Sequence, residues 1–181
     1  MPTPEQIYEQ TLVVRCQLGD EGAFRDLFDL YAARLQLFVR KMISSDQSED
    51  LLQEIWIAIF KGLPRLNEAA KFRPWAFRIA RDRVFREFRK KRVEVEPIED
   101  DRLAHTASEE NPLDRVDLEE LQDRLQTLSP PHREVLMLYY LEELSYEEIA
   151  RVTSTSLGTV RSRIHYAKNI LRKNWYEKRS I

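Results

Sequence analysis

Apolar residues recur at intervals of three and four along most of the chain, the spacing that places side chains on one face of an α-helix. The clearest case begins at Asp20, which is followed by a long aromatic-rich stripe expected to be buried. Its members are Phe24, Leu27, Phe28, Tyr31, Leu35, Phe38 and Met42. No segment alternates long enough to predict a strand, so the pattern predicts an all-α fold.

Three further helices are expected in the first half of the chain. The first has Thr3 and Pro4 at its start, ends near Gly19, and turns four apolar residues inward. These are Ile7, Leu12, Val14 and Leu18. The next runs from about residue 49 to 62, with Leu52, Ile55, Trp56, Ile59 and Leu63 inward. The last spans residues 71–92, with Ala76, Phe77, Ala80, Val84 and Phe88 on one side.

The composition changes abruptly at residues 93–112, which contain two prolines, many carboxylates and little apolar periodicity. This segment is typical of a flexible acidic linker. Helical periodicity resumes at Leu113 and stops near Ser129, where Ser129, Pro130 and Pro131 begin another helix. We therefore expect two small helical domains, 1–92 and 113–181, joined by the linker 93–112.

Residues 144–173 have the outline of a helix-turn-helix. Ser145 and Glu148 form the capping box of a first helix, and Leu144 and Ile149 occupy the positions of a hydrophobic staple. Polar residues at 153–155 interrupt the apolar pattern before Ser156, which is expected to cap a second helix.

The second of these helices divides its side chains by angle. Leu157, Val160, Ile164, Ala167 and Leu171 fall on one stripe, which is expected to face the domain interior. Opposite this stripe lie Gly158, Thr159, Ser162, His165, Tyr166 and Asn169, and the flanks carry Arg161, Arg163, Lys168 and Arg172. Short polar groups bordered by cations suit a helix in the DNA major groove. From periodicity alone, an ordinary amphipathic helix with a solvated basic face remains the alternative.

The formal net charge of -2 conceals a strong segregation of charge. Residues 71–92 carry ten cations against two acids, residues 93–120 carry eleven acids against two arginines, and residues 151–181 carry eight cations against one acid. Two basic blocks on one chain indicate two contacts with nucleic acid.

Several other classes of function are disfavoured by composition. Cys16 is the only cysteine, and His105, His132 and His165 lack the spacing of metal ligands, so neither a metal site nor a cofactor is expected. The sequence shows no catalytic carboxylate pair, no nucleophile with a base and no phosphate-binding loop, so an enzyme is not predicted. Without an apolar signal core or a run of transmembrane length, the chain is expected to be cytoplasmic.

Taken in order, the motifs resemble a bacterial RNA polymerase sigma factor of the extracytoplasmic-function (ECF) type of the sigma-70 family. The resemblance covers about residues 18–173. GDEGAFRDLFDLY is similar to the family's opening helix, EDLLQEIW to its core-polymerase-binding helix and FRPWAFRIARDRV to its promoter-melting segment. REVLMLYYLEELSYEEIA and LGTVRSRIHYAK are similar to its C-terminal helix-turn-helix. A non-catalytic subunit that directs core RNA polymerase to promoters is implied.

The resemblance implies a polymerase-binding surface on the helix at 49–62, against the β′ clamp helices. Its residues are Asp50, Gln53, Glu54, Trp56 and Ile57. An exposed apolar Ile57 beside carboxylates independently indicates a protein-binding face, with a solvated acidic face as the alternative. Contact with the β flap and control by an anti-sigma factor are also implied.

A minus-10 DNA-binding set is implied on the basic helix: Lys71, Trp75, Arg78, Arg81, Asp82, Arg83, Arg86 and Lys90. An indole among guanidinium groups can stack on an unpaired base while cations hold phosphates. Partial burial of Trp75 against the preceding helix is the alternative. The family commonly has Asn where this chain has Asp82, and an acid where it has Arg86.

A minus-35 set is implied on the helix-turn-helix: Tyr146, Glu147, Gly158, Thr159, Arg161, Ser162, Arg163 and Tyr166. Ser154 stands where the family often has a turn glycine, and Tyr166 stands where Arg is common. The competing hypothesis is a stand-alone helix-turn-helix regulator whose N-terminal domain senses a signal or dimerises.

Overall fold

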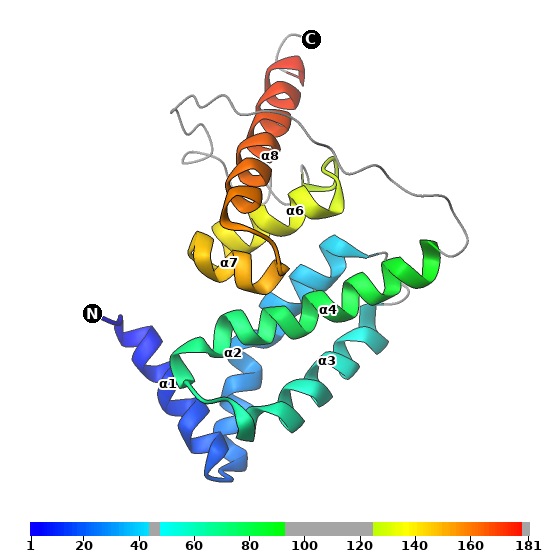
Figure 1. Cartoon of the computed structure of the whole chain (residues 1–181). Helices are drawn as coiled ribbons and strands as arrows, with labels where there is room; N and C mark the ends of the chain where they lie inside the picture. The colour runs from blue at the N-terminus through cyan, green and yellow to red at the C-terminus, as the bar shows by residue number, and fades with distance from the viewer. Residues whose placement is uncertain (44–47, 93–124, 179–181) are drawn as a thin grey trace. The chain divides into compact units, whose positions relative to one another are not determined.

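A computed structural model describes residues 1–43, 48–92 and 125–178, and every regular element in these ranges is helical (Figure 1). The all-α prediction is confirmed there. Backbone contacts divide the chain into two units, Met1–Lys90 and Lys91–Ile181. Within the described ranges, no helix combines the length and the apolar character needed to cross a membrane. The predicted linker and the helix expected to begin at Leu113 lie outside the described residues, except for the end of that helix.

In its described residues, 1–43 and 48–90, the first unit has four α-helices and two short 3-10 turns. They are α1 (Pro4–Gln17), α2 (Glu21–Met42), α3 (Ser48–Gly62), η2 (Leu63–Arg65), η3 (Ala69–Lys71) and α4 (Phe72–Arg92). As predicted, Thr3 caps α1, and its side chain forms a reciprocal capping box with Gln6. Asp20 caps α2 by accepting from the Ala23 amide at 3.0 Å. Between these helices Gly19 adopts φ 89°, a conformation that favours glycine.

The core of the first unit is formed where α1, α3 and α4 pack against α2. Phe38 of α2 meets Phe77 of α4 edge-to-face with ring centroids 5.5 Å apart, and Tyr31 meets Phe72 in the same way at 5.1 Å. All four rings are essentially inaccessible to solvent. Burying each such ring stabilises the fold by about 2–3 kcal/mol, so these contacts fix α4 on α2.

The predicted inward face of α1 is largely wrong. Leu12 is buried, but Ile7, Val14 and Leu18 are 53%, 46% and 82% exposed. The buried stripe instead runs through Glu9, Leu12 and Val13. A charged residue therefore lies at a core position, which an apolar pattern cannot reveal.

The predicted stripe of α2 is correct except at its N-terminal end. Phe24 is half-buried and Phe28 is 39% exposed, whereas Ala23 and Leu27 are fully buried. The predicted inward face of α3 is also partly wrong. Leu52 and Trp56, predicted to face inward, are only half-buried, whereas Leu51, which was not in the predicted face, is buried. The aromatic side chains at this edge of the unit pack on one another rather than in the core.

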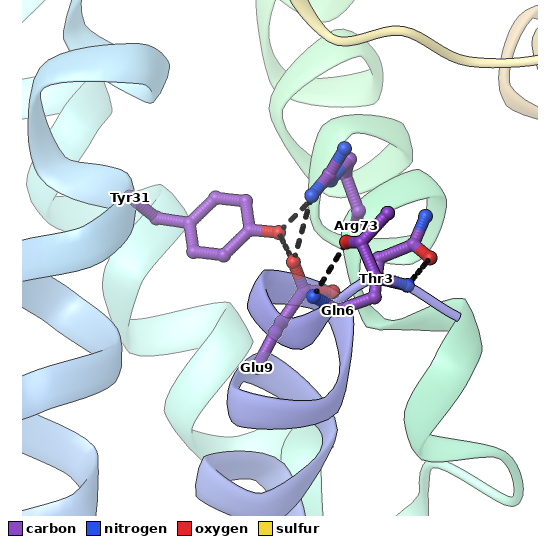
Figure 2. Close-up of polar contacts among 5 residues, drawn as sticks. All are labelled: Thr3, Gln6, Glu9, Tyr31 and Arg73. Carbon is purple, nitrogen blue, oxygen red and sulfur yellow. Dashed lines mark hydrogen bonds and ion pairs between the residues drawn. The ribbon is translucent and has the colours of Figure 1, made fainter.

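A buried polar network joins three helices of the first unit (Figure 2). Tyr31 of α2 donates a short hydrogen bond to Glu9 of α1, and Arg73 of α4 contacts Glu9 at 3.1 Å and Tyr31 at 3.2 Å. Burial and the Glu9 carboxylate raise the pKa of Tyr31, so the phenol keeps its proton and donates. Burial alone would lower the pKa of Arg73, but its contacts with Tyr31 and Glu9 raise it. The positive charge of Arg73 thus balances the negative charge of Glu9 inside the first unit.

The described part of the second unit packs α8 (Leu157–Lys178) on α6 (Pro130–Leu136) and on α7 (Tyr146–Thr153), with a π-helical turn, η5 (Met137–Leu141), after α6. Ser129 and Pro130 begin α6 as predicted. Arg133 is buried and donates to the carbonyls of Leu125 and Leu128 at 2.8 and 2.9 Å. Burial lowers the pKa of Arg133, and these carbonyls accept hydrogen bonds from its Nε and Nη2 groups. The guanidinium therefore closes the end of the preceding helical turn.

Among residues 125–178, two that are not glycine adopt left-handed backbone conformations, Glu143 (φ 53°) and Ser154 (φ 54°). Such a conformation costs a residue with a β-carbon about 1 kcal/mol. We expect Glu143→Gly to raise the free energy of unfolding by about 0.5–1 kcal/mol, measured by chemical denaturation of the full chain. As a control, Arg151→Gly at an exposed position in α7 should lower it by about 1 kcal/mol. A loss of stability in both variants would contradict strain at Glu143.

Candidate functional site

The outer face of α3 carries all five residues of the predicted polymerase-binding set. Asp50, Gln53 and Glu54 are exposed, Ile57 is 54% exposed, and Trp56 is half-buried. The expectation that Ile57 lies outward beside carboxylates is therefore confirmed. This arrangement offers both an apolar contact and negative charge to a partner.

The structure adds two aromatic residues to this surface that sequence reasoning had assigned to the core or passed over. Phe60, one helical turn after Ile57, is 60% exposed and meets Phe24 edge-to-face at 4.9 Å. Phe28 lies 4.5 Å from Trp56, measured between ring centroids. The spacing of Ile57 and Phe60 was the available sequence signal, since i and i+3 share a helix face. We call Phe28, Ile57 and Phe60 the α2–α3 apolar surface.

Trp75 near the start of α4 is half-buried against the end of α3, so the alternative considered from the sequence, partial burial against the preceding helix, is confirmed. Its indole packs against Gly62 at the end of α3 and against the Phe72 ring, 5.9 Å away between centroids. The other part of the side chain remains accessible. A partly fixed and partly exposed indole is suited to stacking on an unpaired base.

The cations of the predicted minus-10 set differ in their surroundings. Four of them are paired with carboxylates: Lys71 with Glu68, Arg81 with Asp82, Arg83 with Glu54, and Lys90 with Glu87. Arg78 and Arg86 are exposed and make no ion pair with any residue in the described ranges. These two arginines are the cations of the set most available to an anionic ligand.

One ion pair connects two predicted surfaces. The Arg83 guanidinium lies 3.2 Å from the Glu54 carboxylate, and both side chains are accessible to solvent. Exposed pairs of this kind contribute about 0.2–1 kcal/mol, so a stronger partner can replace either residue. A charge change at Glu54 would consequently disturb α4 as well as α3.

The turn of the helix-turn-helix forms as the sequence predicted. Ser145 and Glu148 make a reciprocal capping box at the start of α7. Ser154, which stands where the family often has a turn glycine, has a left-handed backbone and ends that helix. Ser156 then caps α8, accepting from the Thr159 amide at 3.0 Å.

The two faces of α8 are also as predicted. Val160, Ile164, Ala167 and Leu171 are buried, and Leu157 is half-buried. On the opposite face Gly158 is exposed and Thr159, Ser162 and Tyr166 are half-buried, and on the flanks Arg161 is exposed and Arg163 is half-buried. Ser162 donates to the Thr159 carbonyl at 3.0 Å, and Asn169 contacts His165 at 2.9 Å. The outer face therefore presents short polar groups next to cations.

Tyr146 and Lys168 take part in an aromatic cluster beside this face. The Tyr146 ring lies 5.2 Å from that of Tyr139, and burial raises the pKa of Tyr146. The Lys168 ammonium lies over the rings of Tyr139 and Tyr140, 5.6 and 5.3 Å from their centroids. Lys168 is thus directed at aromatic rings within the protein, and its cation is engaged there.

Comparison with known proteins matches both halves of the chain to one family. Residues 27–94 match Sigma-70 region 2, and residues 118–171 match Sigma-70, region 4. The ECF RNA polymerase sigma factor SigW of Bacillus subtilis (strain 168) is 30% identical over 168 residues, covering 86% of this chain and 90% of SigW. The chain belongs to the ECF sigma factors of the sigma-70 family. The ECF RNA polymerase sigma-E factor of Escherichia coli (strain K12) is likewise 30% identical over 179 residues, covering 92% and 94% of the two chains.

Solved structures have the same fold. CnrH, in complex with the cytosolic domain of CnrY, is 22% identical with a TM-score of 0.67, covering 94% of this sigma factor and 98% of CnrH. The sigma factor RpoE from Bartonella quintana, in complex with the anti-sigma factor NepR, is 25% identical with a TM-score of 0.64, covering 83% and 94%.

Membership of this family establishes the general activity. This sigma factor is a promoter-directing transcription initiation factor that works with RNA polymerase, and it is not an enzyme. The competing hypothesis of a stand-alone regulator is not favoured, because the N-terminal half matches a sigma region as well.

Proposed function

We propose that the two units of this sigma factor divide promoter recognition between them. The first unit joins core RNA polymerase through α3 and opens the minus-10 element with α4, and the second reads the minus-35 element with α8. The domains would have the boundaries 1–92 and 113–181, with 93–112 as linker. The observation that carries the proposal is that the chain presents two surfaces suited to DNA of different kinds, a basic helix with an indole and a helix-turn-helix.

For polymerase binding, Asp50, Gln53 and Glu54 would face the basic clamp helices of β′. Trp56 would support the α2–α3 apolar surface from below. The side chains of Ile57 and Phe60 would be buried against the polymerase and lose their contact with water. Apolar side chains surrounded by charged groups are typical of the centre of a protein interface. The second unit would in addition contact the β flap.

For promoter opening, Trp75 would stack on a base at the edge of the melted duplex, with Arg78 and Arg86 on phosphates. Lys71, Arg81, Arg83 and Lys90 would exchange their carboxylate partners for phosphates. A flipped base would be read near Asp82, whose ionised carboxylate accepts hydrogen bonds but cannot donate them. Stacking and a pocket are needed because base extrusion costs a few kcal/mol.

For the minus-35 element, α8 would enter the major groove of duplex DNA. Gly158, Thr159, Ser162, Arg163 and Tyr166 would face the bases, with Arg161 on a phosphate. Tyr146 and Glu147 at the start of α7 would lie near the DNA.

An anti-sigma factor is a further proposed partner. RpoE, which shares the fold and 25% of its residues, was solved with the anti-sigma factor NepR. An anti-sigma factor that covered Ile57 and Phe60 would block polymerase binding. We place the activity in the cytoplasm, where core RNA polymerase is found.

Reconstitution tests the proposed function. The full chain is mixed with core RNA polymerase, promoter sequences are selected from a random duplex pool, and the start sites of transcripts are mapped. Two conserved elements upstream of a defined start are the expected result. Absence of binding to core polymerase, or tight binding to an operator without polymerase, would refute the proposal.

The position of Lys168 gives a prediction on the salt dependence of promoter binding. Binding weakens as salt rises, and each phosphate contact adds about 0.9 to the steepness of the fall of log K with log salt concentration. Arg161→Met should make this fall less steep by about 1 for the reconstituted holoenzyme. Lys168→Met should leave the steepness unchanged because Lys168 lies on tyrosine rings. Fluorescence anisotropy on the selected promoter at several salt concentrations measures both slopes. Equal losses would place Lys168 on a phosphate.

A further inference from the structure

Gly62, the last residue of α3, lies against the indole of Trp75. A β-carbon at position 62 would be 2.7 Å from Cζ2 and 3.2 Å from Cη2 of that ring. Carbon atoms in van der Waals contact stay about 3.5–4.0 Å apart. With any residue other than glycine at this position, the ring and the β-carbon would have to move apart by roughly 0.8 Å or more.

The backbone at Gly62 does not itself require glycine. Its φ of -87° and ψ of -25° lie in the right-handed helical region, where alanine is the better helix former. Gly19, in contrast, has φ 89° and nothing within 4 Å of a built β-carbon. What glycine provides at position 62 is space, and the group that occupies this space is Trp75.

We propose that Gly62 is a positioning residue for promoter opening, because it sets how deeply the Trp75 indole lies between α3 and α4. The inference rests on the proposed role of Trp75. The indole is bounded by Gly62 at one edge and by Phe72 at another, so its position is determined by packing. Stacking requires close contact, and a ring pushed outward by Gly62→Ala no longer meets the unpaired base at the same height.

The test compares four forms of the full chain in reconstituted holoenzyme: wild type, Gly62→Ala, Trp75→Phe and the double variant. Phenylalanine lacks the ring atoms that a β-carbon at position 62 would strike. Lys61→Ala, at the neighbouring exposed position of α3, is the matched control. Permanganate reactivity of minus-10 thymines on a promoter selected by wild-type holoenzyme measures opening. Retention on immobilised core polymerase and thermal unfolding are followed for every form.

We expect Gly62→Ala to slow opening about fivefold to tenfold, at the lower end of the range for losing one stacked base. Lys61→Ala should open like wild type. On a template already melted at minus-10, where the duplex need not be opened, Gly62→Ala should come close to wild type in transcript yield, a rescue that a general folding defect would not show. The double variant should open like Trp75→Phe alone.

Normal opening by Gly62→Ala would overturn the positioning role, and so would a further loss in the double variant relative to Trp75→Phe. If Gly62→Ala does not fold, the comparison of the double variant with Trp75→Phe still decides the matter. Failure of the wild-type chain to bind core polymerase or to open any promoter would instead refute the proposed function. Normal opening by Trp75→Phe and Gly62→Ala together would refute both the stacking role of Trp75 and its positioning by Gly62.

Discussion

Arg73→Met is expected to lower the free energy of unfolding by about 3–5 kcal/mol, the range found when one partner of a buried ion pair is removed. Glu9 is only 5% exposed, and without Arg73 its carboxylate would remain in the interior with no ion-pair partner among the described residues. Because Glu9, Tyr31 and Arg73 come from α1, α2 and α4, the loss should loosen the packing of all three helices. Chemical denaturation of the full chain followed by circular dichroism measures the effect.

An exposed ion pair in the same unit provides the control for this prediction. Lys71 contacts Glu68 at 2.6 Å, but both side chains are about half exposed, so Lys71→Met should cost at most about 1 kcal/mol. The double variant Glu9→Leu with Arg73→Met removes both charges and should recover much of the stability lost in Arg73→Met. A cost for Arg73→Met no larger than that for Lys71→Met would show that Glu9 does not depend on Arg73.

The same network explains why α1 was predicted poorly. A period of 3.6 residues identifies a core face only when that face is apolar, and here Glu9 occupies a core position. Its partner Arg73 is 64 residues away in the sequence, and no local pattern connects the two residues. By contrast, the long stripe of α2 from Leu27 to Met42 was predictable, because consecutive turns repeat the same signal.

The helix-turn-helix was predictable in detail because each of its boundaries depends on local chemistry. Ser145, Glu148 and Ser156 cap helices through contacts that span three residues. The relation between Gly62 and Trp75 could not be found in this way, since it depends on how α3 and α4 approach each other. The roles of the individual surface residues in binding polymerase and DNA are still proposals.

The α2–α3 apolar surface gives the second prediction with a large expected effect. Ile57→Asp should weaken the association of the full chain with core polymerase by about 30-fold or more, as for a central interface residue worth 2 kcal/mol or more. Ile57 is a better position than Glu54 for testing α3 alone, because Glu54 is paired with Arg83 and a substitution there would also affect α4. Since Ile57 is 54% exposed, its replacement should leave the stability of the free chain nearly unchanged.

Leu18 supplies a matched control for Ile57. It belongs to the same unit, is apolar and 82% exposed, and lies just beyond α1 in no predicted binding set. Leu18→Asp introduces the same charge at a comparable loss of apolar surface, so it tests whether any exposed apolar residue matters to polymerase binding. We expect Leu18→Asp to bind core polymerase like wild type in a titration monitored by fluorescence anisotropy. If Leu18→Asp and Ile57→Asp weakened binding equally, the effect would come from negative charge in general, and α3 would lose its proposed role as the polymerase-binding helix.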